Sequence, residues 1–359
     1  GSEALELYAR EGPFDAVLLD VMMPHMSGYE CARYLRELKG ASELPIIMVT
    51  AKQQAEDVLA GFEAGANDYI HKPFSKAELM ARLASHLHLG QTARAMRRFV
   101  PADMIRLLGC EHLADLTLGL AAQHTFTIVF TDIIGFTKAI EGMTPAQAFE
   151  WLNRCYQLMG PEIRKAGGFI DKYIGDAGMS LYPESPDAAL APAEAMQLST
   201  RQLQDVHFGT GIHYGQAMLG TLGEEERFDA TVLSDAVNVA SRIEGASKIF
   251  GLAILVSEDF RQALANPGRW HWRPIGVVRL KGRHTTVVLW EVLDADPERL
   301  ELKLSYLQTF EQALRLYSEG RWDQALELWT RLSDAYPDDR VLAFYQEHSA
   351  QHMELASPG

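Results

Sequence analysis

The chain has 359 residues with 47% apolar content and a formal net charge of −15. This length leaves room for more than one folded domain, each with its own core. The negative charge argues against nonspecific binding to nucleic acid or to an anionic membrane. The apolar runs fall short of the ~20 residues of a membrane helix, and the three scattered cysteines lack metal-ligand spacing, which is typical of reduced thiols in a cytosol. We therefore expect a cytoplasmic, multidomain protein.

The first segment alternates apolar strands with helical stretches such as residues 52–64. One strand ends in Asp20, the next in Thr50, and a third in Lys72, which precedes Pro73. This alternation indicates βαβ units, whose ligand sites lie at the carboxyl ends of the strands. We therefore expect Asp20, Thr50 and Lys72 to converge at one edge of a parallel sheet.

These three strand ends resemble those of a response-regulator receiver domain, which has a flavodoxin-like, doubly wound parallel sheet. The resemblance implies that Asp20 accepts a phosphoryl group from a sensor histidine kinase or phosphorelay. It also implies that Thr50 and Lys72 contact this group and that Tyr69 reports the change. A complete receiver begins with a strand ending in an acidic pair, a helix and a second strand, and none of these precedes Phe14. We therefore expect residues 1–90 to be a truncated receiver, from a fragment of a longer protein, in which Asp20 is not phosphorylated normally.

Leucines recur at helical spacing near the end of this segment, at Leu79, Leu83 and Leu87. A stripe this short favours the packing face of the receiver's last helix over a coiled coil. Residues 91–125 are then expected to be a linker.

Two further aspartates, Asp132 and Asp176, each end an apolar run and begin a turn that contains glycine. Asp is an ordinary turn residue, so either one alone carries little information. After Asp132 the chain passes Gly135, and a helix is expected near Phe136, where free N–H groups suit phosphate. Paired carboxylates suit Mg²⁺ or Mn²⁺, and two such ions can activate a hydroxyl and stabilise a pyrophosphate leaving group. This pattern predicts a nucleotide enzyme.

Residues 231–244 predict a capped helix that starts at Ser234 or Asp235. Asn238 and Arg242 are four residues apart and share one face of it. An isolated Asn/Arg pair is usually solvated surface. Here the Asn/Arg pair follows the two aspartate turns, the second of which has Lys172 ahead of it. The run 278–282, which contains Lys281, comes after the pair.

Taken in order, these elements resemble the catalytic domain of class III adenylyl and guanylyl cyclases, a ferredoxin-like α/β sandwich, over residues 126–294. The resemblance implies an enzyme that converts ATP to cyclic AMP and pyrophosphate with two Mg²⁺ or Mn²⁺ ions per active site. Asp132, Asp176 and the backbone carbonyl of Ile133 would bind the metals. Arg242 would stabilise charge on the α-phosphate. The remaining substrate contacts would come from Gly135, Phe136, Thr137, Asn238, which would orient the ribose, and Lys281, which would hold the terminal phosphates.

Base selection is expected at Lys172 and Thr231, a combination that resembles a bacterial adenylyl subgroup. Adenine offers an acceptor at N1 and a donor at N6, which a lysine and a hydroxyl would complement. Because a Thr hydroxyl can donate as well as accept, we expect weaker discrimination at Thr231 than an Asp would give. We assign the hydrogen bond between Thr231 and the base roughly 1 to 2 kcal/mol. Lys172 would then carry most of the preference against GTP.

In this family Lys172 and Asp176, which flank one hairpin, would serve different active sites of a two-fold dimer. The resemblance therefore implies a homodimer with two shared sites and an inactive monomer.

Three alternatives are weighed against an adenylyl cyclase. A cyclic di-GMP synthase is excluded because its Gly-Gly-acidic-acidic-Phe signature is absent. Lys172 disfavours a guanylyl cyclase. A non-catalytic module for nucleotide sensing or dimerisation would require loss of a metal or transition-state residue, and all are present. Ile134 and Gly178 are unusual for the family, and a glycine in a strand predicts a looser hairpin around Asp176.

Residues 295–359 resemble one tetratricopeptide helix pair. A single repeat cannot form a solenoid groove, so a helical cap is favoured over a peptide-binding array. The sequence thus predicts a multidomain α/β and α+β protein: a partial receiver, a linker, a cyclase domain and a short helical tail.

Overall fold

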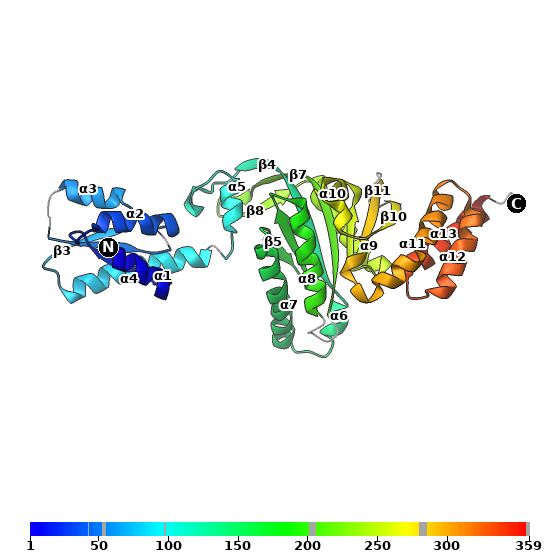
Figure 1. Ribbon diagram of the computed structural model, residues 1–359, viewed down its shortest axis with the longest axis horizontal. Helices are drawn as coiled ribbons and strands as arrows, with labels where there is room; N and C mark the ends of the chain where they lie inside the picture. Colours follow the sequence, from blue (N-terminus) through cyan, green and yellow to red (C-terminus); the bar gives the residue numbers. More distant parts are fainter. Residues whose placement is uncertain (42, 52–54, 97, 201–205, 280–285, 357–359) are drawn as a thin grey trace. The chain divides into compact units, whose positions relative to one another are not determined.

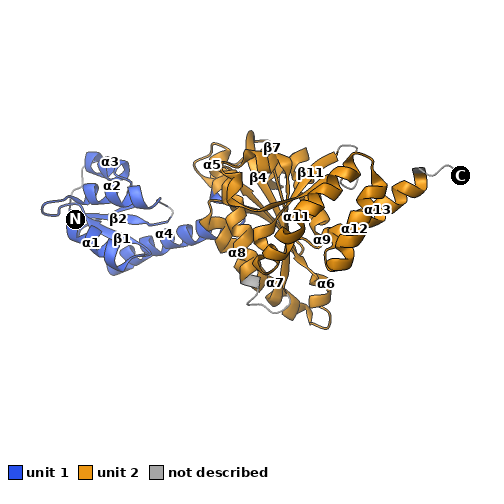
Figure 2. Cartoon of the chain, turned by 45° about the vertical axis from the view of Figure 1, so that its right-hand side comes forward, with its two compact units in different colours: residues 1–102 blue, residues 103–359 orange. Residues whose placement is uncertain are grey.

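The computed structural model describes residues 1–41, 43–51, 55–96, 98–200, 206–279 and 286–356. The chain forms two compact units, Gly1–Ala102 and Asp103–Gly359 (Figure 2). Each unit has its own β-sheet and its own hydrophobic core.

The first unit is built around a three-stranded parallel sheet in the order β1-β2-β3 (Figure 1). Its strands are β1 (Val17–Asp20), β2 (Ile46–Thr50) and β3 (Asp68–His71). Its helices are α1 (Ser2–Glu11), α2 (Gly28–Leu38), α3 (Ala55–Glu63) and α4 (Lys76–Met96). The parallel pairing confirms the prediction of βαβ units.

Local sequence explains two of these helices. At the start of α2, Ser27 and Glu30 form a reciprocal capping box, in which the Ser27 amide donates to the Glu30 carboxylate at 2.8 Å. Leu79 and Leu83 of α4 pack against buried residues of β2 and β3, as expected for the last helix of a receiver. Helix α4 continues through the predicted boundary at residue 90 and ends at Met96.

The second unit contains an eight-stranded sheet in the order β10-β11-β9-β7-β4-β6-β5, with β8 paired to β7. Its strands are β4 (Ala121–Ile134), β5 (Phe169–Ile174), β6 (Ala177–Tyr182), β7 (His207–Glu224), β8 (Arg227–Leu233), β9 (Ile254–Ser257), β10 (Trp272–Arg279) and β11 (Thr286–Val292). Strand β7 is central, because it pairs antiparallel with β4 and β8 and parallel with β9.

Helices cover this sheet and connect its strands (Figure 1). They are α5 (Ala102–Leu107), η1 (Leu113–Asp115), α6 (Phe136–Ala139), α7 (Pro145–Lys165), η2 (Pro186–Ala189), α8 (Leu190–Thr200), α9 (Asp235–Phe250), α10 (Glu258–Ala263), η3 (Pro267–Arg269) and η4 (Leu293–Ala295). One buried cluster joins residues of α7, α8 and α10 to residues of β4, β7 and β9.

Three further helices, α11 (Pro297–Ser318), α12 (Trp322–Ala335) and α13 (Arg340–Ala356), form a helical extension of the same unit. Helices α11 and α12 correspond to the predicted helix pair, and α13 adds a third helix. The extension shares one hydrophobic cluster with α9, in which Ile243 and Phe250 join Phe310 and Trp329. It is therefore packed onto the domain that precedes it.

A buried group of charges also ties the extension to the sheet. Arg273 of β10 is fully buried and donates through Nε to Glu291 of β11 at 2.6 Å. Lys303 of α11 pairs with the same carboxylate, and Asp339 accepts hydrogen bonds from Arg273 and from Tyr306. Burial opposes ionisation of Asp339, but the Arg273 guanidinium holds its pKa below the usual range. Breaking one partner of this group would leave a buried charge uncompensated.

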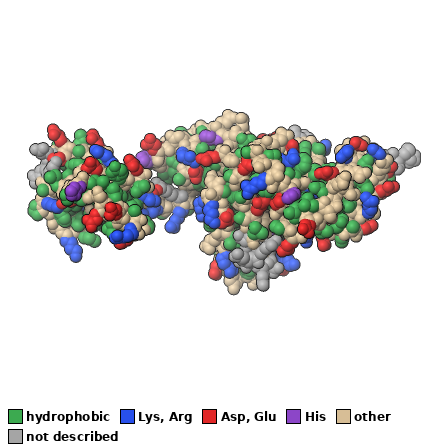
Figure 3. Space-filling view, viewed as in Figure 1, with side chains coloured by type: hydrophobic (Ala, Val, Ile, Leu, Met, Phe, Trp, Pro, Cys, Tyr) green, Lys and Arg blue, Asp and Glu red, His purple; other side chains and the backbone are tan. Residues whose placement is uncertain are grey.

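No helix in the described part of the chain is both long and apolar enough to cross a membrane. Acidic and basic side chains are interspersed over the face drawn in Figure 3.

Candidate active site

The two predicted metal-binding aspartates meet through strand pairing. Strands β4 and β6 are antiparallel, and their register places Asp132 opposite Ala177. Asp176 immediately precedes Ala177, in the Gly175–Asp176 turn between β5 and β6. The structure thus brings together two carboxylates that lie 44 positions apart in the sequence.

Asp132 lies in a nearly closed environment, with 3% of its surface exposed. Its Oδ2 forms an ion pair with Lys248, while its Oδ1 is buried without a hydrogen-bond partner. Lys248 Nζ also lies 3.2 Å from Glu244 Oε1. Burial, and then the negative charge of Asp176, raise the pKa of Glu244 to about 7. A third carboxylate and an ammonium group therefore adjoin the two aspartates.

Sequence reasoning missed Glu244 and Lys248. The signal was available, because the two are four residues apart on the helix that carries Arg242, a spacing that places opposite charges side by side.

The donor set fits the divalent cations that the sequence predicts. Carboxylate and carbonyl oxygens are hard ligands, and the partnerless Oδ1 of Asp132 has a hydrogen-bonding capacity that a cation would satisfy. Among the described residues, no group of three or more His, Cys, Asp or Glu side chains is arranged to hold a metal. Backbone and nucleotide oxygens would therefore have to complete the coordination.

The segment after Asp132 turns sharply. Gly135 has φ of 78°, a left-handed conformation that favours glycine. The predicted helix follows as α6, which is four residues long. The Phe136 ring packs against Trp151 at 6.1 Å between centroids, and Thr137 is exposed.

Aromatic contacts support the turn that carries Asp176. The rings of Tyr156 and Tyr173 stack at 4.0 Å, and the Tyr156 hydroxyl donates to the Gly175 carbonyl. A Cβ at Gly178 would lie 3.1 Å from Met159 Cε, so the glycine allows α7 to approach the strand closely. These contacts hold in place the hairpin that Gly178 was expected to loosen.

Helix α9 presents the predicted ribose and phosphate residues. The Ser234 hydroxyl caps it by accepting from the Val237 amide at 3.2 Å, which confirms the predicted start. Ile243 is fully buried, whereas Asn238 is exposed and Arg242 is partly exposed. The packing of one face of α9 therefore leaves these two polar side chains accessible.

The predicted base-binding residues lie around one carboxylate. Thr231 Oγ1 donates to Asp171 Oδ2 at 3.2 Å, and Lys172 Nζ lies 3.5 Å from the same oxygen. The Asp171 side chain is fully buried. This burial raises its pKa to about 6, and Lys172 opposes the shift. Asp171 was not among the predicted site residues, although it directly precedes Lys172.

The remaining predicted substrate residue, Lys281, lies outside the described residues.

In the first unit, the predicted phosphoacceptor edge is also assembled. Lys72 Nζ lies 2.5 Å from Asp20 Oδ2, and the Met22 amide donates to Asp20 Oδ1 at 3.0 Å. The Lys72 hydrogen bond lowers the pKa of Asp20, against the opposing effect of burial. Thr50 is buried at the end of the neighbouring strand.

The predicted switch residue Tyr69 is buried. Its hydroxyl forms hydrogen bonds to the Asp57 carbonyl and, at 2.9 Å, to the Tyr29 hydroxyl.

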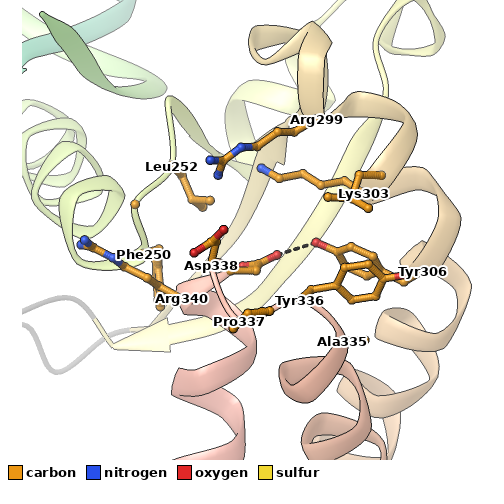
Figure 4. A pocket seen from close by; sticks show the side chains of 13 residues that line it. Phe250, Leu252, Arg299, Lys303, Tyr306, Ala335, Tyr336, Pro337, Asp338 and Arg340 are labelled. Carbon is orange, nitrogen blue, oxygen red and sulfur yellow. Dashed lines mark hydrogen bonds between the residues drawn. The ribbon is translucent and has the colours of Figure 1, made fainter. Parts of the chain in front are cut away.

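A cavity of about 250 Å³ lies elsewhere in the second unit, between the end of α9 and the helical extension. Arg299 and Lys303 of α11 extend toward Asp338 across it (Figure 4). None of the predicted catalytic residues lines this cavity.

Comparisons with known proteins agree with this division of the chain. The response regulator receiver domain model matches residues 1–84, and the adenylate and guanylate cyclase catalytic domain model matches residues 120–291. An adenylate cyclase from Anabaena cylindrica is 38% identical over 219 residues, which cover 57% of this chain and 44% of that protein. Response regulator MprA from Mycobacterium leprae is 42% identical over 118 residues, which cover 33% of this chain and 46% of that protein. The chain thus spans less than half the length of either relative.

The solved structure of a bacterial light-regulated adenylyl cyclase has a similar fold. Its TM-score is 0.55 at 22% sequence identity, with 68% of this chain and 73% of that chain covered. The two domain models, the parallel sheet of the first unit and the mixed sheet of the second lead to one conclusion. The chain consists of a response regulator receiver domain followed by a catalytic domain of the adenylate and guanylate cyclase family and a helical extension.

Proposed function

We propose that this chain is an adenylyl cyclase that converts ATP to 3′,5′-cyclic AMP and pyrophosphate. The observation that carries the proposal is the β4–β6 register, which brings Asp132 beside the Asp176 turn. The names of relatives support it, since the matched Anabaena protein is an adenylate cyclase.

Each predicted residue has a chemical role in this reaction. Asp132, Asp176 and the Ile133 carbonyl would hold two Mg²⁺ or Mn²⁺ ions, which supply activation of the 3′-hydroxyl and neutralise charge on the pyrophosphate. Asn238 would orient the ribose, and Arg242 would stabilise charge on the α-phosphate as the 3′-oxygen attacks.

The other predicted substrate residues would hold the two ends of the nucleotide. Lys281 would bind the terminal phosphates, while the turn and helix start at Gly135, Phe136 and Thr137 would lie beside the phosphate chain. Lys172 and Thr231 would read the base. No protein nucleophile is required, because the substrate supplies its own attacking oxygen.

We infer that the active form is a homodimer with shared sites, in which one protomer supplies the aspartates and the other supplies Asn238 and Arg242. Exposed apolar side chains near the predicted site support a partner surface, with 45% of Tyr173, 50% of Ile174 and 67% of Leu233 accessible. Because each site needs two protomers, the separation of the protomers would control the rate.

In a protein with a complete receiver, phosphorylation of Asp20 would regulate this dimer in a two-component pathway, with a histidine kinase or phosphorelay as the phosphodonor. The Asp20–Lys72 pair supports this role, because a phosphoryl group on Asp20 would replace one negative charge with about two and alter that contact.

Product analysis tests the proposal. Purified protein with Mn²⁺ or Mg²⁺ should form cyclic AMP from ATP and less cyclic GMP from GTP. Arg242→Ala should abolish most turnover while nucleotide binding persists, because its charge is required in the transition state. Cyclic GMP as the main product would instead establish a guanylyl cyclase.

A second candidate is a non-catalytic nucleotide-sensing or dimerisation module. The ion pair between Lys248 and Asp132 favours it, since this ammonium lies against a predicted metal ligand. Retained nucleotide binding with no cyclic product from either nucleotide would support this candidate.

A further inference from the structure

The backbone of β5 is irregular next to the predicted base-binding residues. Its pairing with β6 shifts between Ile170, which faces Ser180, and Lys172, which faces Met179. Asp171 is therefore an extra, bulged residue in the ladder. In a regular strand, neighbours point to opposite faces, whereas a bulge re-aims a side chain. This irregularity explains how Asp171 and its neighbour Lys172 approach each other.

Asp171 contacts both side chains that are expected to read the base. Its Oδ2 accepts the Thr231 hydroxyl at 3.2 Å and lies 3.5 Å from Lys172 Nζ. Its Oδ1 is also buried, without a hydrogen-bond partner. Burying the charge of a carboxylate costs free energy, and buried polar groups are normally hydrogen-bonded. The burial of Asp171 against two predicted substrate residues therefore points to a role in positioning them.

The chemistry of the two groups fixes the direction of the Thr231 hydrogen bond. A threonine hydroxyl has one proton and two lone pairs, while an ionised carboxylate can only accept. When the proton points to Asp171, only lone pairs remain for a ligand. Thr231 then acts as an acceptor.

An acceptor at this position distinguishes the two purines. Adenine carries an amino group at C6, which donates to Thr231, whereas guanine carries an oxygen there, which would face a lone pair. Lys172 keeps further donors for N1 of adenine, where guanine has an N–H. Buried groups left unpaired in this way reject a ligand strongly.

We propose that Asp171 is a specificity-determining residue, which fixes the Thr231 hydroxyl as an acceptor and holds Lys172, so that the site prefers a 6-aminopurine nucleotide over a 6-oxopurine nucleotide. The inference rests on the proposed function for its reaction, but nucleotide binding alone can also test it. It revises the expectation that a threonine discriminates weakly at this position.

The test compares Asp171→Leu, which removes the acceptor, with Thr231→Val, which removes the hydroxyl, and with both changes together. For each protein, the dissociation constants of non-cyclisable ATP and GTP analogues and the two kcat/KM values are measured. Each single change should lower the preference for ATP over GTP about tenfold, both in affinity and in kcat/KM, which is the scale of one hydrogen bond. This preference is the ATP/GTP ratio below. The double variant should have about the same ATP/GTP ratio as each single variant, because the two single changes remove the same interaction.

Two additional variants complete the design. Thr231→Asp in the Asp171→Leu background supplies an acceptor that needs no orienting partner, and it should restore the ratio. Glu225→Ala is the matched control, since it removes an exposed carboxylate in the turn between β7 and β8 and should leave the ratio unchanged. Thermal melting checks that the variants fold, and Asp171→Ala replaces Asp171→Leu if leucine does not fit.

A purely structural role for Asp171 predicts a different outcome. ATP and GTP parameters would then fall by the same factor, the ratio would stay constant and Thr231→Asp would rescue nothing, which would overturn the proposal. If the parent chain binds nucleotides but forms no cyclic product, the cyclase proposal fails, while the binding ratios still decide the role of Asp171.

Discussion

At the scale of single residues, the most unusual contact is the ion pair between Lys248 and Asp132. A buried carboxylate needs a compensating charge, and Lys248 provides one from the helix that also carries Arg242. The same carboxylate is a predicted metal ligand, through its partnerless Oδ1 as well. The lysine and a divalent cation would therefore compete for the negative charge of this carboxylate.

We expect Lys248→Met to increase Mn²⁺ affinity severalfold, because the competing charge is removed while the aliphatic stem is kept. The effect should be modest, since 42% of the Lys248 side chain is exposed and water screens the pair. Mn²⁺ titration followed by electron paramagnetic resonance measures it directly. Lys165→Met is the control, because Lys165 pairs with Glu162 at the end of α7. Weaker Mn²⁺ binding by Lys248→Met would show instead that the lysine organises the site.

Asp171 provides a second prediction, on pH and stability. Its folded pKa of about 6 lies above the usual aspartate value of about 3.9, so ionisation of this carboxyl opposes folding. The penalty is nearly absent below about pH 3, grows between the unfolded pKa and the folded pKa of about 6, and is complete above about pH 7. Asp171→Asn should therefore stabilise the protein at pH 8 by up to about 3 kcal/mol, the free energy of a two-unit shift.

Thermal melting of Asp171→Asn and the parent at pH 8 and at pH 5 measures this effect. The gain in melting temperature should be clear at pH 8 and roughly half as large at pH 5. An equal gain at both values would mean that the carboxyl charge is not the cause.

At the scale of elements, α9 links the predicted chemistry to the helical extension. Its N-terminal half carries Asn238 and Arg242, and its last residue, Phe250, meets Phe344 of α13 edge to face at 5.1 Å. The extension thus supports the helix that holds the predicted ribose and phosphate contacts, which agrees with a helical cap.

Phe344→Ala should remove this support. Since Phe344 is partly buried, we expect a loss of about 2 kcal/mol of unfolding free energy, below the full cost of a core phenylalanine. We also expect kcat to fall more than KM rises, because α9 would position Arg242 less well. Leu355→Ala, at a side chain that is 84% exposed near the end of α13, is the control. Unchanged kcat in a destabilised Phe344→Ala protein would limit the extension to a stabilising role.

Some of these elements are predictable from the sequence and others are not. The meeting of Asp20, Thr50 and Lys72 at one edge of the sheet was predictable, because parallel βαβ units bring the carboxyl ends of their strands together. The third strand ends one residue earlier than predicted, at His71. The capped start of α9 followed from Ser234. The bulge at Asp171 was not predictable, because it depends on the register that β5 adopts against β6. For the same reason, the contact of Lys248 with Asp132 required the packing of α9 against β4.

At the scale of the whole molecule, the chain joins a receiver domain to a cyclase-family domain whose predicted site residues belong to different elements. Asp132 and Asp176 lie at a hairpin of the sheet, and Asn238 and Arg242 lie on α9. In a homodimer with shared sites, each catalytic centre would combine the hairpin of one protomer with α9 of the other. Two different inactive proteins could then complement each other.

Mixing Asp176→Ala with Arg242→Ala therefore tests the central claim most directly. Each variant alone should form almost no cyclic AMP from ATP with Mn²⁺. After mixing and re-equilibration, half of the dimers would be mixed and each would have one intact site, so activity should return to about a quarter of the parent value. A parent chain without cyclic AMP production would contradict the proposed reaction, and an active parent with no recovery on mixing would contradict the shared sites.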